Sequence, residues 1–197
     1  RFHCWKHGGH GTVNLTRSLE QSCDVFYYEV AQKVGIDAIA EMGKRMGLGV
    51  RHDLPMSAIT DGIMPNKDWK QERWGQDWRI GDTINASIGQ GYVLASPLQL
   101  AVMTARVATG RAVEPRLIKS IGGKPVEMPE PPLLDLDPAS LRAVQAGMDA
   151  VMNSERGTAK SSRIADETML MAGKTGTAQV RKLVARGHVG DWKSRDH

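Results

Sequence analysis

The sequence predicts an α/β (α+β) chain that is rich in helix and has one strand of chemical interest near its C-terminal end. Apolar residues recur at helical spacing in four segments, and helix start and stop signals flank them. Residues 168–180 instead combine glycines, hydroxyls and a cation. The 197 residues, 41% of them hydrophobic, suffice for a buried core and suggest one domain or a large part of one.

Two helices are expected in the N-terminal quarter of the chain. The first covers residues 24–34, where apolar side chains follow helical spacing up to a stop signal at Gly35. The second covers residues 36–46, presents one apolar stripe and ends at Gly47.

Residues 50–84 contain several turn signals and no clear periodicity, so we expect a long surface loop there. Three tryptophans, Trp69, Trp74 and Trp78, stand among its charged residues. They suit a glycan platform or a partner contact, but packing beneath a loop is the more common role of such residues. We therefore assign them no function.

A third helix has a strong start signal. Ser96 can cap it, Pro97 fits its first position and Gln99 completes a capping box. We expect this helix over residues 97–108, before a stop at Gly110.

The fourth helix repeats the signal of a cap followed by proline at Asp137 and Pro138. It is expected to run to Asn153 and to end before the Gly-Thr-Ala triplet at 157–159. Between the third and fourth helices, residues 113–121 favour a short extended pair.

Residues 171–180, MAGKTGTAQV, have the composition of a strand against which a ligand lies. Strand alternation would point Lys174 to one face and Thr175 and Thr177 to the other, while Gly176 would let another backbone approach. A phosphate loop is the alternative for a Gly-Lys-Thr triplet, but it needs a glycine five residues before the Gly-Lys pair. This chain has threonine there, which makes the phosphate loop a weak alternative.

Lys and Arg exceed Asp and Glu by 26 to 22, but the charges are interspersed, so a nucleic-acid partner is not indicated. The chain begins at Arg1 without an apolar leader, and residues 181–197 form a polar stretch without a closing element. These features indicate an internal segment of a longer protein.

The motifs stand in a specific order. Ser-Cys-Asp at 22–24 comes first, then IGQGY before the Ser-Pro-Leu-Gln-Leu helix, then the triplet at 157–159, and finally AGKTGTAQV. In this order the chain resembles the class B penicillin-binding proteins, over nearly its whole length from Cys4 to His197. The CWKHGGHG and SCDVFYYEVAQKVGID stretches are most similar to the branch of that family that acts in cell elongation.

The resemblance implies the penicillin-binding transpeptidase or serine β-lactamase-like fold, incomplete here. The family uses three motifs: Ser-x-x-Lys with the nucleophile, Ser-x-Asn or Ser-x-Asp, and Lys-Thr-Gly. No lysine of this chain has a serine three residues before it, so the first motif is absent. We therefore expect residues 1–197 to be a partial transpeptidase domain that lacks the nucleophile region upstream and closing strands and a helix downstream. We also expect this piece to be inactive and not independently stable.

By similarity, Ser22, Asp24 and Lys174 are the catalytic residues of this piece. Ser22 would relay a proton between the first-motif lysine and the leaving amine. Asp24 stands where the family usually has asparagine, and it would hold Ser22 and that lysine in register. Lys174 would interact with Ser22 and attract the terminal carboxylate of the substrate.

Thr175, Gly176 and Thr177 would bind the substrate, which is D-alanyl-D-alanine of a peptidoglycan stem peptide or a β-lactam. The two threonine hydroxyls could donate hydrogen bonds to the carboxylate. The backbone N–H of Thr177 would be one oxyanion donor, and the other would belong to the nucleophile.

Cys4, His10 and Cys23 are candidate ligands of a structural zinc ion, and some relatives look similar in having a structural metal here. The fourth ligand could be His7, His3 or a carboxylate before Arg1. A disulfide between the two cysteines and a free buried thiol at Cys23 are the alternatives.

The resemblance further implies a peptidoglycan D,D-transpeptidase that cross-links stem peptides through a serine acyl-enzyme, without a nucleotide or redox cofactor. It would stand at the periplasmic face of the inner membrane and work with a lipid-II-polymerising glycosyltransferase and other elongation proteins. Two alternatives stay open: a non-catalytic, zinc-braced scaffold, and a D,D-carboxypeptidase or serine β-lactamase on the same fold.

Overall fold

The computed structural model describes residues 2–166 and 168–178, and helices dominate it. The elements in chain order are α1 (Leu15–Glu20), α2 (Asp24–Val34), α3 (Ile36–Arg45), α4 (Lys67–Trp74), α5 (Ile80–Ala86), α6 (Pro97–Thr109), β1 (Ser120–Ile121), β2 (Lys124–Pro125), α7 (Pro138–Asn153) and the 3-10 turn η1 (Lys160–Ser162). In the part of the chain that is described, no helix has both the length and the apolar character to cross a bilayer.

The four helices expected from the sequence are confirmed as α2, α3, α6 and α7. Their ends follow the local signals. The Ser96 hydroxyl accepts from the Gln99 N–H and the Gln99 side chain accepts from the Ser96 N–H, which completes the predicted capping box of α6. The Asp137 carboxylate caps the N-terminus of α7, because it accepts a hydrogen bond from the Ser140 N–H at 2.8 Å.

The expectation of a long loop over residues 50–84 is wrong, because α4 lies within this range and α5 begins in it. An Asn66 cap opens α4, and a salt bridge between Lys70 of α4 and Asp82 of α5 joins the two helices at 2.6 Å. The contact that joins the two helices is therefore polar, and a search for apolar periodicity does not detect such a contact. The three tryptophans of this region contact one another or Tyr92 through their rings, which is the packing role that we considered more common.

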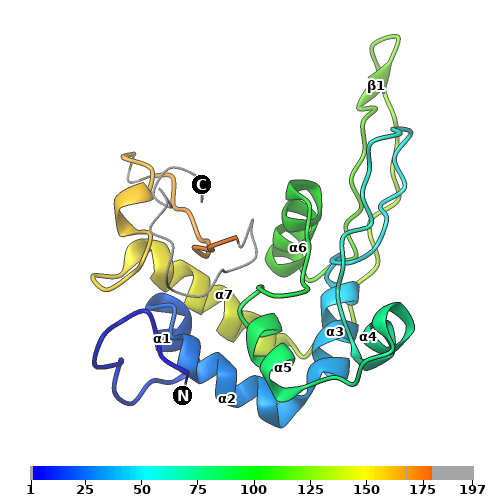
Figure 1. Ribbon diagram of the computed structural model, residues 1–197. Helices are drawn as coiled ribbons and strands as arrows, with labels where there is room; N and C mark the ends of the chain where they lie inside the picture. The colour runs from blue at the N-terminus through cyan, green and yellow to red at the C-terminus, as the bar shows by residue number, and fades with distance from the viewer. Residues whose placement is uncertain (1, 167, 179–197) are drawn as a thin grey trace, which may run out of the picture.

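The short extended pair lies a few residues later than expected. Ser120 pairs with Pro125 and Ile121 with Lys124 in an antiparallel hairpin at the tip of a long arm (Figure 1). Gly122 and Gly123 form the turn with φ values of +55° and +78°, a combination that tight hairpins require and glycine permits.

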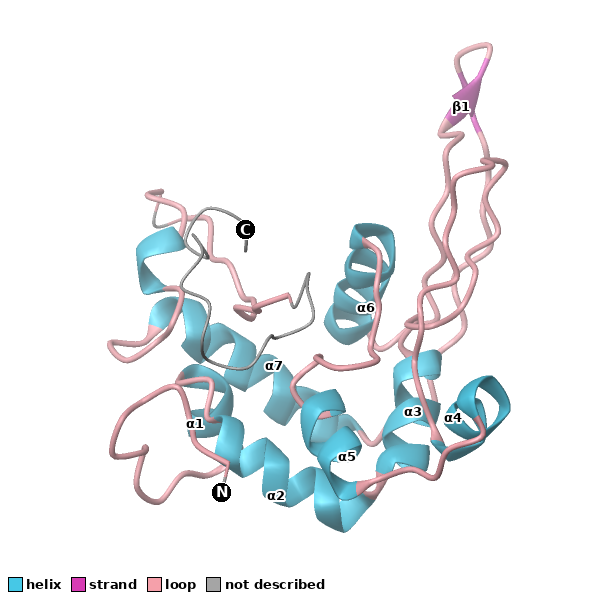
Figure 2. Ribbon diagram, viewed as in Figure 1, coloured by secondary structure: helices cyan, strands magenta, loops and turns pink. Residues whose placement is uncertain are grey.

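The KTG segment is not a strand in the described residues 168–178, so that expectation is wrong (Figure 2). A strand persists only with a neighbour that accepts and donates its backbone hydrogen bonds. No described segment pairs with residues 171–178 in that way. Residues 179–197, which include the end of the expected strand and the polar C-terminal stretch, lie outside the described residues.

The packing of α1 against α7 builds the frame of the site. Gly147 of α7 makes this possible, because a Cβ there would lie 2.3 Å from Cδ1 of Leu19 on α1. Beyond α7, the Thr158 N–H donates to the Glu20 carbonyl at 3.1 Å. The ends of α1 and α7 are thereby fixed together, with the core of Val151, Met152 and Ala159 beside them.

Candidate active site

Ser22 lies in the turn between α1 and α2, directly before the residues that open α2. Its φ of +50° is positive, which is true of no other non-glycine residue among those described. A side chain in this region of backbone space is uncommon and costs energy, and such residues cluster at functional sites. The turn brings the Ser22 hydroxyl toward the segment that follows α7.

The Ser22 hydroxyl contacts three polar groups from the C-terminal part of the chain. The Lys174 ammonium donates to Ser22 Oγ, Thr175 Oγ1 lies 3.2 Å away and Thr158 Oγ1 lies 3.4 Å away. The two threonine hydroxyls are 3.0 Å apart, so they close the network. The structure thus brings Ser22 and the Lys-Thr pair together across 152 residues of sequence.

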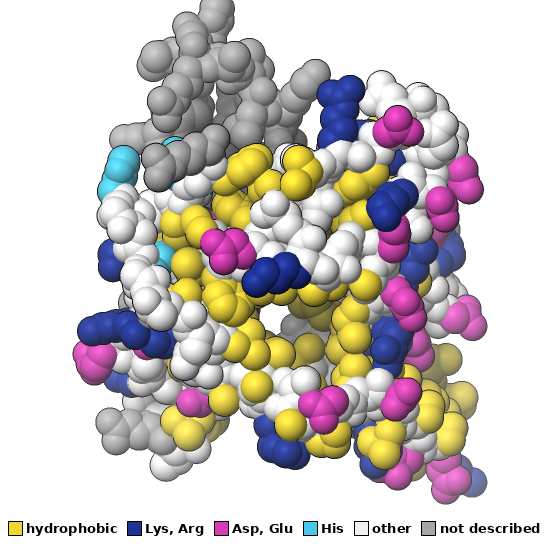
Figure 3. Space-filling view, turned by 90° about the horizontal axis from the view of Figure 1, so that it is seen from below, with side chains coloured by type: hydrophobic (Ala, Val, Ile, Leu, Met, Phe, Trp, Pro, Cys, Tyr) yellow, Lys and Arg dark blue, Asp and Glu magenta, His cyan; other side chains and the backbone are white. Residues whose placement is uncertain are grey.

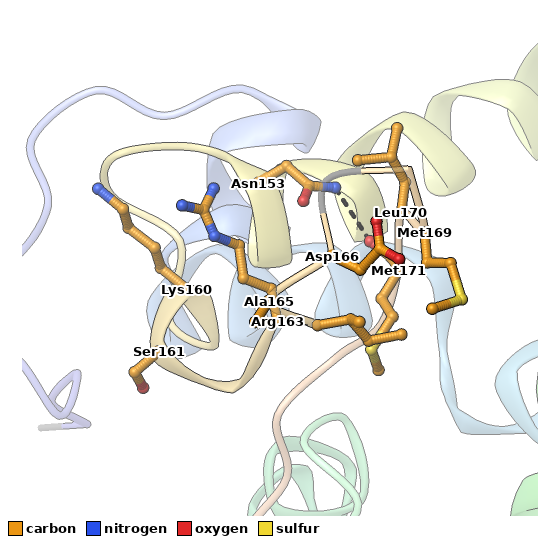
Figure 4. Close-up of a pocket in the computed structure, with 10 residues that line it drawn as sticks. Asn153, Lys160, Ser161, Arg163, Ala165, Asp166, Met169, Leu170 and Met171 are labelled. Carbon is orange, nitrogen blue, oxygen red and sulfur yellow. Dashed lines mark hydrogen bonds between the residues drawn. The ribbon is translucent and has the colours of Figure 1, made fainter.

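The KTG segment is held in place by α7. The Asn153 amide donates to the Met171 carbonyl at 2.9 Å (Figure 4), and the Gly173 N–H donates to the Met148 carbonyl at 3.1 Å. A hollow of about 420 Å³ lies beside this attachment, and charged side chains of Lys160, Arg163 and Asp166 are among its lining. Two hydrogen bonds to α7 thus hold the KTG segment in place of a neighbouring strand.

Lys174 and Thr175 converge on Ser22 instead of pointing to opposite faces, so the expected alternation does not hold. The Lys174 Nζ lies 3.2 Å from Thr175 Oγ1. Without strand dihedrals the two-residue period is lost, and the long lysine side chain folds back. Desolvation lowers the pKa of Lys174 below its ordinary value, and the charge of Asp24 opposes this shift.

Asp24 has a different partner from the expected one. Its carboxylate accepts from the backbone N–H of Trp5 at 3.1 Å, and no hydrogen bond to the Ser22 hydroxyl is found among the described residues. Asp24 therefore acts on Lys174 through its charge and ties the N-terminal loop to the start of α2.

Gly176 and Thr177 are exposed, as are Lys174 and Thr175 before them. A Cβ built on Gly176 would meet nothing within 4 Å, so the space in front of it is open. A ligand can approach the backbone there without displacing a side chain.

Cys4, His10 and Cys23 form a compact cluster whose ligand atoms all lie within 4.8 Å of one another. Both thiols are free, so the disulfide alternative is not seen. Cys4 Sγ lies 3.4 Å from His10 Nδ1, and the buried His10 Nε2 has no hydrogen-bond partner among the residues that the structure describes. Burial lowers the pKa of His10, which favours the neutral imidazole that binds metals. Two sulfurs and one imidazole fit three corners of a tetrahedral zinc shell.

Comparison with known proteins shows the family of the chain. Residues 1–192 match the family of penicillin binding protein transpeptidase domains. The chain belongs to this family. As a member, it is 39% identical over 189 residues to the peptidoglycan D,D-transpeptidase MrdA of Haemophilus influenzae, covering 93% of this chain and 29% of that one. It is 36% identical to MrdA of Escherichia coli, covering 100% of this chain and 32% of that one.

Solved structures of family members give the same result. Penicillin-binding protein 2 of Pseudomonas aeruginosa, in complex with WCK 5153, superposes with a TM-score of 0.82 at 40% identity, over 91% of this chain and 41% of that one. Penicillin-binding protein 2 of Helicobacter pylori, in complex with MreC, gives 0.80 at 36% identity, over 91% of this chain and 33% of that one. The transpeptidase fold expected from the sequence is thereby confirmed, and the chain spans about a third of the length of the curated relatives it matches.

Two residues of the candidate site were not predicted from the sequence. Thr158 touches both Ser22 and Thr175, and its place in the Gly-Thr-Ala triplet was the signal that could have found it. Trp5 donates its indole N–H to the carbonyls of Gln21 and Ser22, and its only signal was its position next to Cys4.

Proposed function

We propose that the chain supplies the Ser-x-Asp and Lys-Thr-Gly parts of the active site of a serine D,D-transpeptidase that cross-links peptidoglycan stem peptides and is acylated by β-lactams. One observation carries the proposal. The hydroxyl of Ser22 lies between the Lys174 ammonium and the Thr158 and Thr175 hydroxyls, at the meeting point of two family motifs. The similarity to enzymes named peptidoglycan D,D-transpeptidase supports it.

In the proposed reaction, a serine of a Ser-x-x-Lys motif attacks the penultimate D-alanine carbonyl of the donor peptide. Terminal D-alanine leaves as an amine after it accepts a proton, and an acyl-enzyme forms. An acceptor amine then attacks the ester, loses a proton and releases the serine, so the peptide bond that breaks is replaced by the one that forms.

Ser22 and Lys174 serve the proton transfers of these two steps. A serine hydroxyl can accept a proton from one neighbour while it donates to another. Desolvation lowers the pKa of Lys174, which brings its ammonium closer to the range in which it exchanges protons. The same positive charge attracts the substrate carboxylate, to which Thr175 and Thr177 offer hydroxyl donors.

Intact mass after incubation with a penicillin tests this proposal. We expect an adduct on the full-length protein, which includes the Ser-x-x-Lys motif, and none on residues 1–197. An adduct on residues 1–197 would make a serine of this chain the nucleophile and would contradict the relay role of Ser22. No adduct on a folded full-length protein would favour the scaffold alternative.

We further propose that Cys4, His10 and Cys23 hold a structural zinc ion. The three side chains already converge to within 4.8 Å, and zinc would draw both sulfurs in as thiolates. Zinc there would supply a fixed anchor for the loop before α1. Metal analysis of protein purified without chelator should give one zinc per chain, and a free-thiol count should rise when the metal is removed. Protein that holds no zinc would contradict this assignment.

The cellular setting is also a proposal. By family resemblance we place the protein at the periplasmic face of the inner membrane, with a lipid-II-polymerising glycosyltransferase as partner. The Helicobacter pylori relative has been solved with MreC, which supports a role among elongation proteins. Fractionation of cells that express the full-length protein with a tag would test the location, and recovery in the cytosol would contradict it.

A further inference from the structure

We propose that Trp5 is a positioning residue, which clamps the backbone of Ser22 and so aims the Ser22 hydroxyl at Lys174. The inference rests on the proposed transpeptidase function for its kinetic consequence, although the clamp itself is a matter of structure. The loop that carries Cys4 and His10 would thereby set the geometry of the active site.

Trp5 makes three hydrogen bonds, all to the four-residue turn 21–24. Its indole Nε1–H is shared between the Gln21 carbonyl at 3.1 Å and the Ser22 carbonyl at 2.9 Å. Its backbone N–H donates to the Asp24 carboxylate at 3.1 Å. A single residue from the N-terminal loop therefore binds both sides of Ser22.

Ser22 needs such support because its backbone is in an unfavourable region. Its φ of +50° disfavours a residue with a side chain, and such a conformation persists only where the surroundings fix it. The shared indole donor draws the carbonyls of Gln21 and Ser22 toward one point, which fixes the peptide planes on either side of Ser22. The direction of the Ser22 side chain follows from those planes.

The orientation of this side chain decides whether the network forms. Ser22 Oγ reaches Lys174 Nζ and, at 3.2 Å, Thr175 Oγ1. A misplacement of about 1 Å in a catalytic group can cost up to about a hundredfold in rate. A small rotation of the turn would thus lower the rate of catalysis while it changes the stability of the fold very little.

The exposure of Trp5 argues against a role in packing alone. The residue is 60% exposed, so its ring contributes little to a core. The ring edge rests on the imidazole of His10, with centroids 5.4 Å apart. His10 and Cys4 in turn lie against Cys23. The cluster anchors the loop at one end, and the indole N–H reaches the active-site turn at the other.

The test is Trp5→Phe in the full-length protein, which keeps a ring and removes the N–H donor. Stopped-flow acylation by a chromogenic cephalosporin would separate the dissociation constant of the first complex from the acylation rate constant. We expect the rate constant to fall about tenfold, within the range that misplacement of a catalytic group produces. We expect the dissociation constant, the zinc content and the melting temperature to stay close to those of the wild type.

Trp74→Phe is the matched control, because Trp74 is also exposed and packs only with rings around Tyr92 among the contacts described. It should leave the acylation rate unchanged. An unchanged rate in Trp5→Phe would overturn the inference. The inference would also be overturned if affinity, zinc content and melting temperature all fell together with the rate constant. That pattern would mean that Trp5 supports the whole loop instead of positioning Ser22.

A second readout does not depend on acylation. The Ser22 and Cys23 amides donate to the Leu19 and Ser18 carbonyls, so their hydrogen exchange reports on the turn. We expect faster exchange of both amides in Trp5→Phe, and equal exchange would overturn the clamp. A wild-type protein that no β-lactam acylates would contradict the proposed function, while the exchange result would still decide the role of Trp5.

Discussion

The ammonium of Lys174 faces neutral hydroxyls at the Ser22 end of the site. Its contacts are Ser22 Oγ, Thr175 Oγ1 at 3.2 Å and the Thr175 carbonyl at 3.1 Å. Desolvation lowers the pKa of the group, and the negative charge of Asp24 partly opposes this shift. Because its hydrogen-bond partners among the described residues are all neutral, the ammonium stays available to the carboxylate of the proposed substrate.

Removing this amine should slow acylation far more than it changes folding. We expect Lys174→Ala in the full-length protein to lower the second-order rate constant for acylation by penicillin by about 10²-fold or more, because a positioned proton-transfer group contributes about 10²- to 10⁴-fold. Lys160→Ala is the control, since its ammonium pairs with Glu155 at 2.7 Å, outside the Ser22 network. Equal rates in the two variants would contradict the role given to Lys174.

The lowered pKa of Lys174 also predicts a pH dependence of stability. The unfolded chain keeps the Lys174 proton up to the ordinary value of 10.5, whereas the folded protein releases it at lower pH. Between these values the unfolded state binds more protons, so folding gains stability as pH rises. In the full-length protein, the melting temperature of the wild type relative to that of Lys174→Met should therefore increase as pH approaches 10.5. A difference in melting temperature that stays constant or decreases as pH rises would contradict the lowered pKa of Lys174.

At the scale of elements, the pair formed by α4 and α5 depends on one buried charge. Lys70 is only 2% exposed, and its ammonium donates to Asp82 at 2.6 Å and to the Asp77 carbonyl at 3.0 Å. The same ammonium lies 5.6 Å from the ring centre of Tyr92. The buried cation thus joins both helices to the residue that follows the Gly-Gln-Gly segment.

Asp82→Asn should destabilise the full-length protein by about 3 kcal/mol, because it leaves the buried ammonium without its counter-ion. Asp37→Asn is a matched control, since each carboxylate accepts from one lysine ammonium and one backbone N–H. The Asp37 pair is exposed, so its loss should leave the melting temperature nearly unchanged. Similar melting temperatures for the two variants would show that the Lys70 pair does not hold α4 and α5 together.

The elements differ in how far sequence alone could predict them. Ser96 with Gln99, and Asp137 with Pro138, are local signals that act within one turn of helix, so α6 and α7 were predictable. Lys70 and Asp82 meet across twelve residues, so no local pattern predicts their pairing. The expectation of a KTG strand was wrong for the same reason. A strand needs a partner that is distant in sequence, and residues 171–178 are bound to α7 instead.

The candidate site shows the same division. The roles predicted for Ser22, Lys174 and Thr175 came from the order of their motifs along the chain and from the resemblance to the family, both of which can be read from the sequence. The role of Trp5 could not be predicted, because it depends on contact with Ser22, the residue of positive φ that lies seventeen residues later in the chain. The cluster of Cys4, His10 and Cys23 lies between these cases: residue types predicted its ligands, and only the fold brings them within 4.8 Å.

At the scale of the whole molecule, two halves of the site come from opposite ends of the chain, joined through α1 and α7. Large parts of the apolar surface stay open. Figure 3 shows hydrophobic side chains around a hollow on the face seen from below, and Val34 of α2 and Ile80 of α5 are 52% and 64% exposed. Met169 and Leu170, which come just before the KTG segment, are also exposed. Such surfaces are typical of faces that another part of a protein covers.

We therefore predict that residues 1–197 alone do not unfold in one cooperative transition. The described residues include eleven buried hydrophobic side chains, of which Val151, Met152 and Ala159 form a contiguous cluster, and this core is small for a chain of this length. Differential scanning calorimetry should give a broad, weak signal for residues 1–197 and a sharp transition for the full-length protein. A sharp transition of residues 1–197, with an enthalpy near the typical value of about 0.7 kcal/mol per residue, would mean that the packing of α1 against α7 stabilises this part of the fold unaided.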